Sequence, residues 1–448
     1  MIPVNISNVL EQAKQVAATK RPTISTLELT LITPELHYPV PNVQRLSKSS
    51  NFLEDGTDVW VINFLMQPGV FLKQILPYKD NLLVDLVEST GINRTLRRLR
   101  ATVPMDVNPQ TNSDNSVYID PGVLDQNMVV PITLILIDTV YEQLRNQPLL
   151  DNYLMATTKD VLHNVWSQQG HAIQSNGVNK FKGVDIEEPT DNPRVYRQIM
   201  VKHGTRLTRF ADYLQNEEGL GIYTRGCGSF YREGIWYVFP ICKPERYGTV
   251  KKSLDIYKFP EDILPVTEQT YGTTANSTLI LSTGPSKLLD GTDNLRQNFG
   301  AGQQIISSDA IAGEVGSHYN NGASVTLRAE KVTEYRTTQR ASGQELIDVN
   351  ATPTNNVFKE ITKNAMRDCK VLELNWTNSN PFLVTPGAPV KYYFLNEQGT
   401  LTIQEGTVIS EKTTYYSDST RPLTPFRKNS ILTILLLPIQ NTTITPNN

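Results

Sequence analysis

The spacing of hydrophobic and polar positions predicts a run of β-strands from residue 25 to about residue 138. Hydrophobic residues alternate with polar ones over residues 27–31, which is the two-residue period of a strand with one buried face. Residues 59–66 and 82–87 are short apolar runs bounded by polar or turn residues, as in buried strands. Residues 129–137 predict a further strand, interrupted by Pro131. Because proline cannot donate to a sheet ladder, Pro131 predicts a sheet edge or a bulge.

The middle of the chain changes to a helical period. An apolar stripe over residues 161–166 predicts a helix, with Thr157 or Thr158 available as its N-cap. A second stripe over residues 207–214 predicts a shorter helix, which Gly219 is placed to end. These elements separate the first group of strands from later ones.

A strand meander follows the second helix. The strand patterns cover residues 220–223, 229–232 and 235–239, and the turn signals between them are Arg225-Gly226 and Glu233-Gly234. Further strand patterns occur at residues 254–257 and 279–281. Together with the two helices, these strands predict a small α+β unit.

The pattern divides the chain into six parts. Seven glycines with many polar residues mark a connection between two strand-rich regions, and residues 356–366 predict one helix in the last of these regions. The parts are an N-terminal helix or arm at 1–24, a first β domain at 25–140, an α+β insertion at 141–283, a glycine-rich connection at 284–324, a second β domain at 325–440 and a polar tail at 441–448.

Composition indicates a folded protein with a large polar surface. The 42 basic and 45 acidic residues give a formal charge of −3, whereas disordered chains usually carry a high net charge. Such a balance argues against general nucleic-acid binding and suits contact with other proteins. The longest apolar run, at 431–439, is too short for a membrane anchor, and the N-terminus has no secretory signal pattern. Three cysteines without C-x-x-C spacing exclude a disulfide scaffold and fit synthesis in a reducing cytosol.

The chain carries no motif of a known catalytic or metal centre. It lacks a nucleophile elbow, a P-loop and an H-E-x-x-H motif, and the pair His163 and His171 is a poor candidate for metal ligation. Cys227 follows Arg225-Gly226 and is either a reactive thiol or, more in keeping with the absence of a base, a plain turn cysteine. The D-G-T-D sequences at 55–58 and 290–293 lack the full ligand set of a calcium loop. We therefore expect no catalytic residue, cofactor or metal.

The one dense basic cluster consists of Arg94, Arg97, Arg98 and Arg100. On a helix the first three share a face, whereas a strand splits them. The cluster predicts a solvated or partner-facing surface, with contact to passing DNA as a secondary possibility. Aromatic residues at 236–239 and 392–394 alternate with the period of a strand and predict core packing.

Pro-Gly dipeptides recur after strand patterns in both β regions. Gln67-Pro68-Gly69 follows the first, and Thr385-Pro386-Gly387 follows a strand at residues 370–376. Either chance or an internal duplication accounts for this repetition.

The order of parts resembles the baseplate hub proteins of contractile phage tails, and the hub region of type VI secretion spike proteins. The likeness is carried by the helix at 356–366, the strand at 370–376, the segment Asn380-Pro-Phe-Leu-Val-Thr-Pro-Gly387 and the strands at 390–394 and 406–409. The helix-plus-meander at 207–247 is similar to a unit of the same hubs.

The resemblance implies a fold and a role. The fold is mixed, β-rich α+β, with two tube-like β-barrel or sandwich domains flanking a small α+β insertion. Three copies then place six similar domains in a ring, on which a hexameric tail tube docks while a trimeric central spike binds the other side. The implied protein is a non-enzymatic homotrimer in the virion tail baseplate, assembled in the host cytoplasm. Its implied partners are the tail tube, spike, baseplate wedge and tape measure proteins, with DNA only in passage through the channel.

Two other interpretations remain open at this point. One is another tail or neck adaptor built on the same β domains. The other is a tail-associated cell-wall hydrolase or receptor-binding protein.

Overall fold

The computed structural model describes most of the chain. The described residues are 24–41, 43–90, 93–104, 129–173, 178–217, 220–248, 252–258, 271–274, 276–282, 286–289, 302–306, 317–320, 323–326, 332–336, 366, 369–395, 401–417 and 425–438. Some predictions concern residues outside this described part, namely those for Gly219, for the 290–293 motif and for the tail at 441–448. The predicted helices at 1–24 and 356–366 also lie outside it, except for Ile24 and Met366.

Strands dominate the structure, which confirms the expectation of a β-rich chain with few helices. The N-terminal region supplies strands that pair in the order β3-β4-β7-β6-β5-β1, with β2 on β1. These strands are β1 (Ser25–Ile32), β2 (His37–Val40), β3 (Val43–Asn51), β4 (Val59–Met66), β5 (Leu83–Thr90), β6 (Asn93–Thr102) and β7 (Val130–Asp138).

Two long C-terminal strands close this group into a ring. β23 (Leu401–Ser417) pairs with β3 through residues 410–415, and β24 (Phe426–Leu436) meets β1 at Ser25 and Phe426. Because β23 and β24 also pair with each other, eight strands form a closed ring, called here the first barrel. The inward positions of its strands form one hydrophobic core, which includes Leu31, Ile62 and Leu134.

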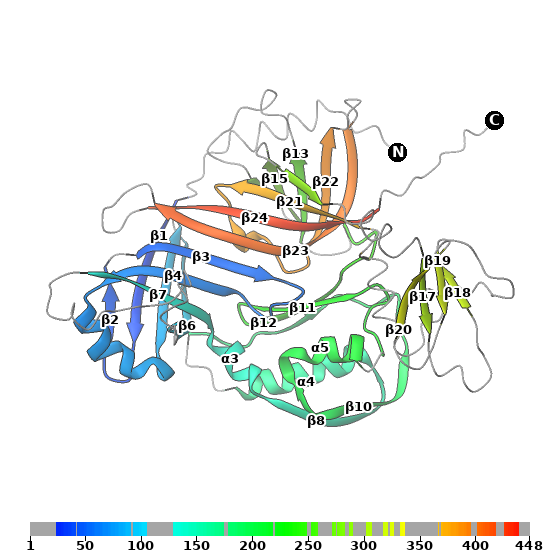
Figure 1. The fold of residues 1–448 in the computed structure, drawn as a ribbon, viewed down its shortest axis with the longest axis horizontal. Helices are drawn as coiled ribbons and strands as arrows, with labels where there is room; N and C mark the ends of the chain where they lie inside the picture. The colour runs from blue at the N-terminus through cyan, green and yellow to red at the C-terminus, as the bar shows by residue number, and fades with distance from the viewer. Residues whose placement is uncertain are drawn as a thin grey trace.

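The same two strands continue into a second β domain. There β23 pairs with β22 and β24 pairs with β21 (Figure 1). The order of this domain is β14-β15-β13-β22-β23-β24-β21-β16. Its remaining strands are β13 (Ser253–Lys258), β14 (Tyr271–Thr273), β15 (Ser277–Ser282), β16 (Ser286–Leu289), β21 (Lys370–Thr377) and β22 (Pro389–Leu395).

The position of β13 and β15 differs from the domain division expected from the sequence. The sequence predicts residues 253–282 as part of the α+β insertion at 141–283, but β13 pairs in parallel with both β15 and β22. Leu254 lies opposite Val390, so the pairing joins segments far apart in the sequence, which local periodicity does not reveal.

The insertion between the β domains is a three-layer α+β unit. Its helices lie between the β8–β10 pair and the β9–β12–β11 sheet in Figure 1. Trp166 and Trp236 stack across one of these contacts, with ring centroids 4.6 Å apart. Its elements are α3 (Thr139–Arg145), β8 (Pro148–Thr157), α4 (Thr158–Ala172), β9 (Gly183–Ile186), β10 (Val195–Arg206), η4 (Leu207–Arg209), α5 (Phe210–Asp212), η5 (Tyr213–Glu217), β11 (Cys227–Arg232) and β12 (Ile235–Pro240).

Several local predictions are confirmed. The Thr157 side chain accepts a hydrogen bond from the Asp160 N–H and caps α4, and the Glu233-Gly234 turn joins β11 to β12. Pro131 lies in the part of β7 that pairs only with β4 among the described strands, because β6 joins β7 from Ile135 onward.

The remaining elements are short and lie between the strands already described. The two Pro-Gly dipeptides are not equivalent, because Pro68 begins a helix whereas Gly387 lies in a turn at φ +69°. The remaining short elements are α2 (Pro68–Val70), η1 (Phe71–Ile75), η2 (Leu76–Asn81), η7 (Pro381–Leu383), β17 (Gly302–Ile306), β18 (Ser317–Asn320), β19 (Ala323–Thr326) and β20 (Val332–Arg336). Two strand pairs, β17 with β20 and β18 with β19, lie partly within residues 284–324, which the sequence predicts as the glycine-rich connection.

Candidate functional site

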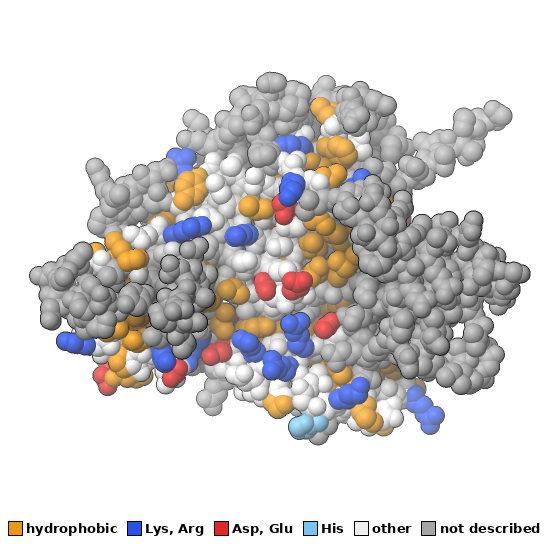
Figure 2. All heavy atoms as spheres, viewed as in Figure 1, with side chains coloured by type: hydrophobic (Ala, Val, Ile, Leu, Met, Phe, Trp, Pro, Cys, Tyr) orange, Lys and Arg blue, Asp and Glu red, His pale blue; other side chains and the backbone are white. Residues whose placement is uncertain are grey.

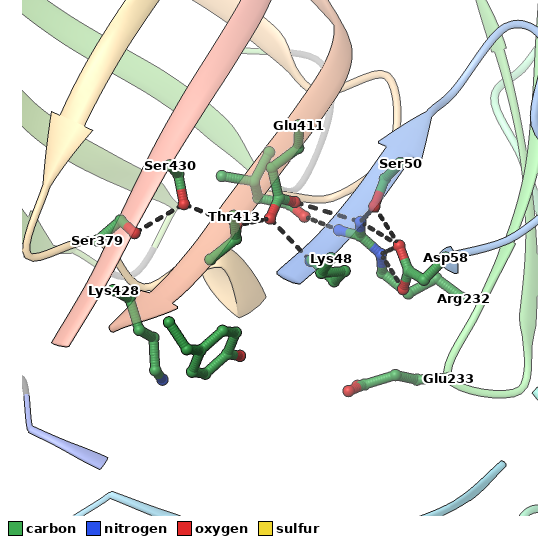
Figure 3. A network of polar contacts seen from close by, with 12 residues as sticks. Lys48, Ser50, Asp58, Arg232, Glu233, Ser379, Glu411, Thr413, Lys428 and Ser430 are labelled. Atoms are coloured by element: carbon green, nitrogen blue, oxygen red, sulfur yellow. Dashed lines mark hydrogen bonds and ion pairs between the residues drawn. The ribbon is translucent and has the colours of Figure 1, made fainter. Parts of the chain in front are cut away.

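A buried ionic network lies where the first barrel, the insertion and the second β domain meet (Figure 3). We call it the junction network. The first barrel supplies Lys48 and Ser50 from β3 and Asp58 from the segment before β4, the insertion supplies Arg232 at the end of β11, and the long strand β23 supplies Glu411. Three parts of the chain that are distant in sequence are therefore held by one set of charges.

Arg232 is the centre of the junction network. Its guanidinium donates from Nε and Nη2 to both carboxylate oxygens of Asp58, at 3.0 Å and 2.7 Å. Nη2 also donates to Glu411 Oε2 at 3.2 Å and to Ser50 Oγ at 3.1 Å, while Nη1 donates to the Val384 carbonyl at 2.8 Å. The planar fork of arginine suits this bidentate geometry, which a lysine ammonium cannot reproduce.

Within the junction network, the pKa of each buried group depends on the charges of its neighbours. Burial alone would lower the pKa of Arg232, but the Asp58 and Glu411 carboxylates outweigh it and raise that pKa. For Asp58, burial would raise the pKa, but Arg232 and Lys48 outweigh burial and hold it below its usual value. Burial and repulsion from Arg232 lower the pKa of Lys48, although its Nζ lies 2.7 Å from Glu411 Oε1. Removing one partner would leave a buried charge without compensation.

A second ionic group lies inside the same barrel. Glu88 on β5 forms ion pairs with Lys428 on β24 and, at 3.4 Å, with Arg97 on β6. The Tyr415 hydroxyl on β23 and the Ser25 hydroxyl on β1 both donate to the Glu88 carboxylate. Burial lowers the pKa of Lys428, and its ion pair with Glu88 offsets this only in part. All five residues come from strands of the closed ring, so this group links its walls.

Phe382 joins the two ionic groups. It belongs to η7, between two strands of the second β domain, yet its ring packs against the core of the first barrel. The guanidinium carbon of Arg97 lies 4.2 Å from the ring centroid, and the ammonium nitrogens of Lys48 and Lys428 lie 5.4 Å and 5.5 Å from it. Cations near an aromatic ring are attracted by its quadrupole, most strongly where water is excluded.

A second arginine of the insertion binds the same segment of the second β domain. Arg246 pairs with Glu187 through Nε and Nη2, and Nη2 also donates to the Gly387 carbonyl at 2.8 Å. Its Nη1 donates to Thr407 Oγ1 at 2.9 Å. Arg232 and Arg246 thus hold residues 384–387, which contain the Pro-Gly turn noted in the sequence.

A cavity of about 140 Å³ lies beside the junction network, and its carboxylates are engaged by neighbours. Asp58 binds Arg232, and Glu233 binds Arg97 at 2.9 Å. Burial raises the pKa of Asp138 to about 6, yet Asp138 accepts hydrogen bonds from two backbone N–H groups and caps α3. These carboxylates hold elements together, and this arrangement suits mechanical support.

The structure decides between the two arrangements that the sequence left open for the arginine cluster. Arg94, Arg97, Arg98 and Arg100 lie on strand β6, so they are divided between its two faces and share no helical face. Each pairs with a carboxylate on a neighbouring element, and Arg94 and its partner Glu28 are the most exposed of these pairs. The other pairs join Arg97 to Glu88 and Glu233, Arg98 to Asp85, and Arg100 to Glu142.

The other candidate residues are placed apart from the junction network, with one exception. Burial raises the pKa of the Cys227 thiol, which favours the plain cysteine over the reactive one. His163 and His171 are exposed on α4, and the described residues contain no group of three or more His, Cys, Asp or Glu side chains able to hold a metal. Asp58, from the first D-G-T-D sequence, is the exception because it pairs with Arg232.

Sequence reasoning missed Lys48, Arg232, Glu411 and Lys428, although the strands contained a signal. On β3, Leu46, Lys48 and Ser50 share the buried face, and on β24 Phe426 and Lys428 do so. A charged residue at an inward position of an alternating strand requires a buried partner. The pattern identifies such residues but not their partners, which lie in distant parts of the sequence: Lys48 pairs with Glu411, and Lys428 pairs with Glu88.

Comparison with known proteins finds similarity among solved structures. No protein-family model and no curated protein matches the chain. Similar structures include a tail protein from Neisseria meningitidis (10% identity, 91% of this chain and 96% of that chain, TM-score 0.46) and the 43 kDa tail protein of prophage MuSo2 from Shewanella oneidensis (13%, 91% and 98%, 0.45). An Escherichia coli component of the type VI secretion system is also similar (10%, 91% and 77%, 0.43).

These structures are of the same kind as the proteins that the sequence resembles, namely phage tail and type VI secretion proteins. Their identities are low and their TM-scores are below 0.5, so these likenesses by themselves establish no function for this chain. No helix in the described part of the chain is both long and apolar enough to cross a membrane.

Proposed function

We propose that this chain is a structural component of a phage tail, and specifically a homotrimeric baseplate hub. In this role it joins the hexameric tail tube to a trimeric central spike and lines the channel through which the tape measure protein and DNA pass. It contacts baseplate wedge proteins around its outside, and it is assembled in the host cytoplasm.

The observation that carries the proposal is the continuity of the two β domains. β23 and β24 pair with β3 and β1 at one end and with β22 and β21 at the other. Hinge motion between the domains would break several ladders of backbone hydrogen bonds, each costly to leave unpaired. A fixed spacing between two β domains is what a trimer needs to present six domains to a six-fold tube.

The buried ionic groups support a structural role. Arg232 and Arg246 bind the insertion to both β domains, which restricts motion between the three parts. Acidic and basic side chains are interspersed on the face of the molecule that Figure 2 shows. Such a surface suits protein contacts along its outside and passage of DNA without tight binding.

A non-enzymatic role is part of the proposal. The carboxylates around the cavity beside the junction network are bound to cations or backbone N–H groups. A general acid or base must instead reach a substrate proton at hydrogen-bond distance. The carboxylates of this cavity therefore support a structural role over the hydrolase alternative.

The mass of the native protein tests the proposal. A homotrimer has three times the 50.3 kDa of the chain, about 151 kDa, which native mass spectrometry distinguishes from a monomer. We expect that species, and a three-fold particle with six peripheral β domains by electron microscopy. A monomer at every soluble concentration and also in the presence of purified spike protein would overturn the proposal. Peptidoglycan release measured in the same samples tests the hydrolase alternative.

A further inference from the structure

Two cysteines that are distant in the sequence lie next to each other in the structure. Cys242 follows β12 in the insertion, and Cys369 directly precedes β21 in the second β domain. They are 127 positions apart, yet their Sγ atoms are 3.9 Å from each other. The pair therefore bridges the boundary that Arg246 also spans.

The surroundings of this pair are apolar. Cys242 is 3% exposed and Cys369 is 6% exposed, and both pack in a cluster with Ile241, Leu435 and Leu437. The third cysteine, Cys227, lies elsewhere, and its Sγ contacts its own neighbour's carbonyl, that of Gly228, at 3.6 Å. The chain thus has one neighbouring pair of cysteines and one separate cysteine.

We propose that Cys242 and Cys369 are a cross-linking site, at which a peroxide converts the two thiols into a disulfide. Because both thiols are buried, the reaction proceeds from a locally opened state that admits the peroxide. There one thiolate attacks the peroxide oxygen, forming a sulfenic acid and releasing water or an alcohol. The second thiol then attacks the sulfenic sulfur, forming the S–S bond and releasing water. The two sulfurs together lose two electrons and two protons, and the peroxide is reduced.

The geometry requires only a small movement. The sulfurs must close from 3.9 Å to about 2.05 Å to form the bond. The cross-link would close a loop of more than a hundred residues between the insertion and the second β domain. Closing a long loop restricts the unfolded chain, so the oxidised protein resists unfolding more than the reduced one. This proposal does not depend on the function proposed above.

Thiol mapping after oxidation tests the site directly in the wild-type chain. The native protein is treated with hydrogen peroxide, denatured, alkylated with N-ethylmaleimide, digested and analysed by mass spectrometry. We expect a disulfide-linked peptide pair containing Cys242 and Cys369, together with an alkylated or peroxide-oxidised Cys227 peptide. Recovery of Cys242 and Cys369 as separate alkylated peptides, or their oxidation to unlinked sulfinic acids, would overturn the proposal.

Matched variants give a second measurement. Oxidation is expected to raise the thermal midpoint by about 4–8 °C in the wild type and in Cys227→Ser. The same treatment should leave the midpoint of Cys369→Ser unchanged, and dithiothreitol should reverse the shift in the first two proteins. An equal shift in all three proteins would show that the stabilisation does not come from this pair.

Discussion

Replacing Arg232 with methionine tests the account of the junction network most directly. Methionine retains much of the side-chain length but removes the bonds to Asp58, Glu411, Ser50 and the Val384 carbonyl. Lys48 then remains as the one cation of the junction network beside two carboxylates. Breaking a buried ion pair from one side typically costs about 3–5 kcal/mol of unfolding free energy, and we expect a loss of this size.

Urea unfolding followed by tryptophan fluorescence provides the measurement. Arg94→Met is the matched control, because Arg94 makes a single ion pair with Glu28 and both side chains are more than half exposed. Exposed pairs of this kind contribute about 0–1 kcal/mol. We therefore expect the control to stay close to wild type. Arg232→Lys, which keeps the charge but loses the fork, should fall between the two.

The pH dependence of the stability lost in Arg232→Met provides a second test. In the wild type the pKa of Asp58 is below its unfolded value, so its stabilisation is present above the unfolded pKa of about 3.9 and is lost as pH falls below it. Without Arg232, burial should raise that pKa above the unfolded value, so the variant gains stability as pH falls from about 7 to about 5. The difference in unfolding free energy between Arg232→Met and the wild type should therefore become smaller as pH falls from about 7 to about 5. A loss below about 1 kcal/mol, or a difference that is constant with pH, would refute this account.

Three further predictions concern other contacts. Gly387→Val should lower the free energy of unfolding in urea by about 2–5 kcal/mol, because φ is +69° and a Cβ would lie 2.1 Å from the Phe239 ring. The control Gly204→Ala, at φ +87° with open space around it, should lower it by only about 1–2 kcal/mol. Equal losses of unfolding free energy in the two variants would contradict this prediction. Arg246→Met should speed amide hydrogen exchange around Gly387, just before β22, and around Thr407 on β23, and unchanged protection there would show that this arginine does not hold them. Burial raises the pKa of Asp138 to about 6, so its ionisation costs folded-state stability as pH rises. The stability of Asp138→Asn relative to wild type should thus improve by about 1–2 kcal/mol between about pH 4 and pH 7, as measured by urea titrations, and no change with pH would refute the raised pKa.

Local sequence patterns predicted many individual elements of this fold. The alternation at residues 27–31 became β1, the stripe at 161–166 became α4 with its Thr157 cap, and Pro131 lies at a one-sided part of its strand. Each of these features depends on interactions between residues close in the sequence. The arginines on β6 show the limit, because their spacing fits a helix while their pairing with β5 and β7 decided the strand.

The candidate site was much less predictable. Charged residues at inward strand positions could have been noticed, but Arg232 lies 174 positions from Asp58 and 179 from Glu411. The same holds for Cys242 and Cys369, whose spacing in the sequence carries no sign of contact. A residue's partner across a domain boundary is set by how the domains pack, and one sequence contains no direct record of that packing.

The sequence by itself determined the strand-rich character of the chain, its interrupting helical unit and several turns, because backbone conformation and amphipathic period are local properties. Only the tertiary structure decided that β23 and β24 belong to both β domains and that β13 joins the second one. Backbone hydrogen bonds pair strands without regard to side-chain identity, so many pairings are compatible with one local pattern. Burial of the apolar faces and compensation of the buried charges select among them.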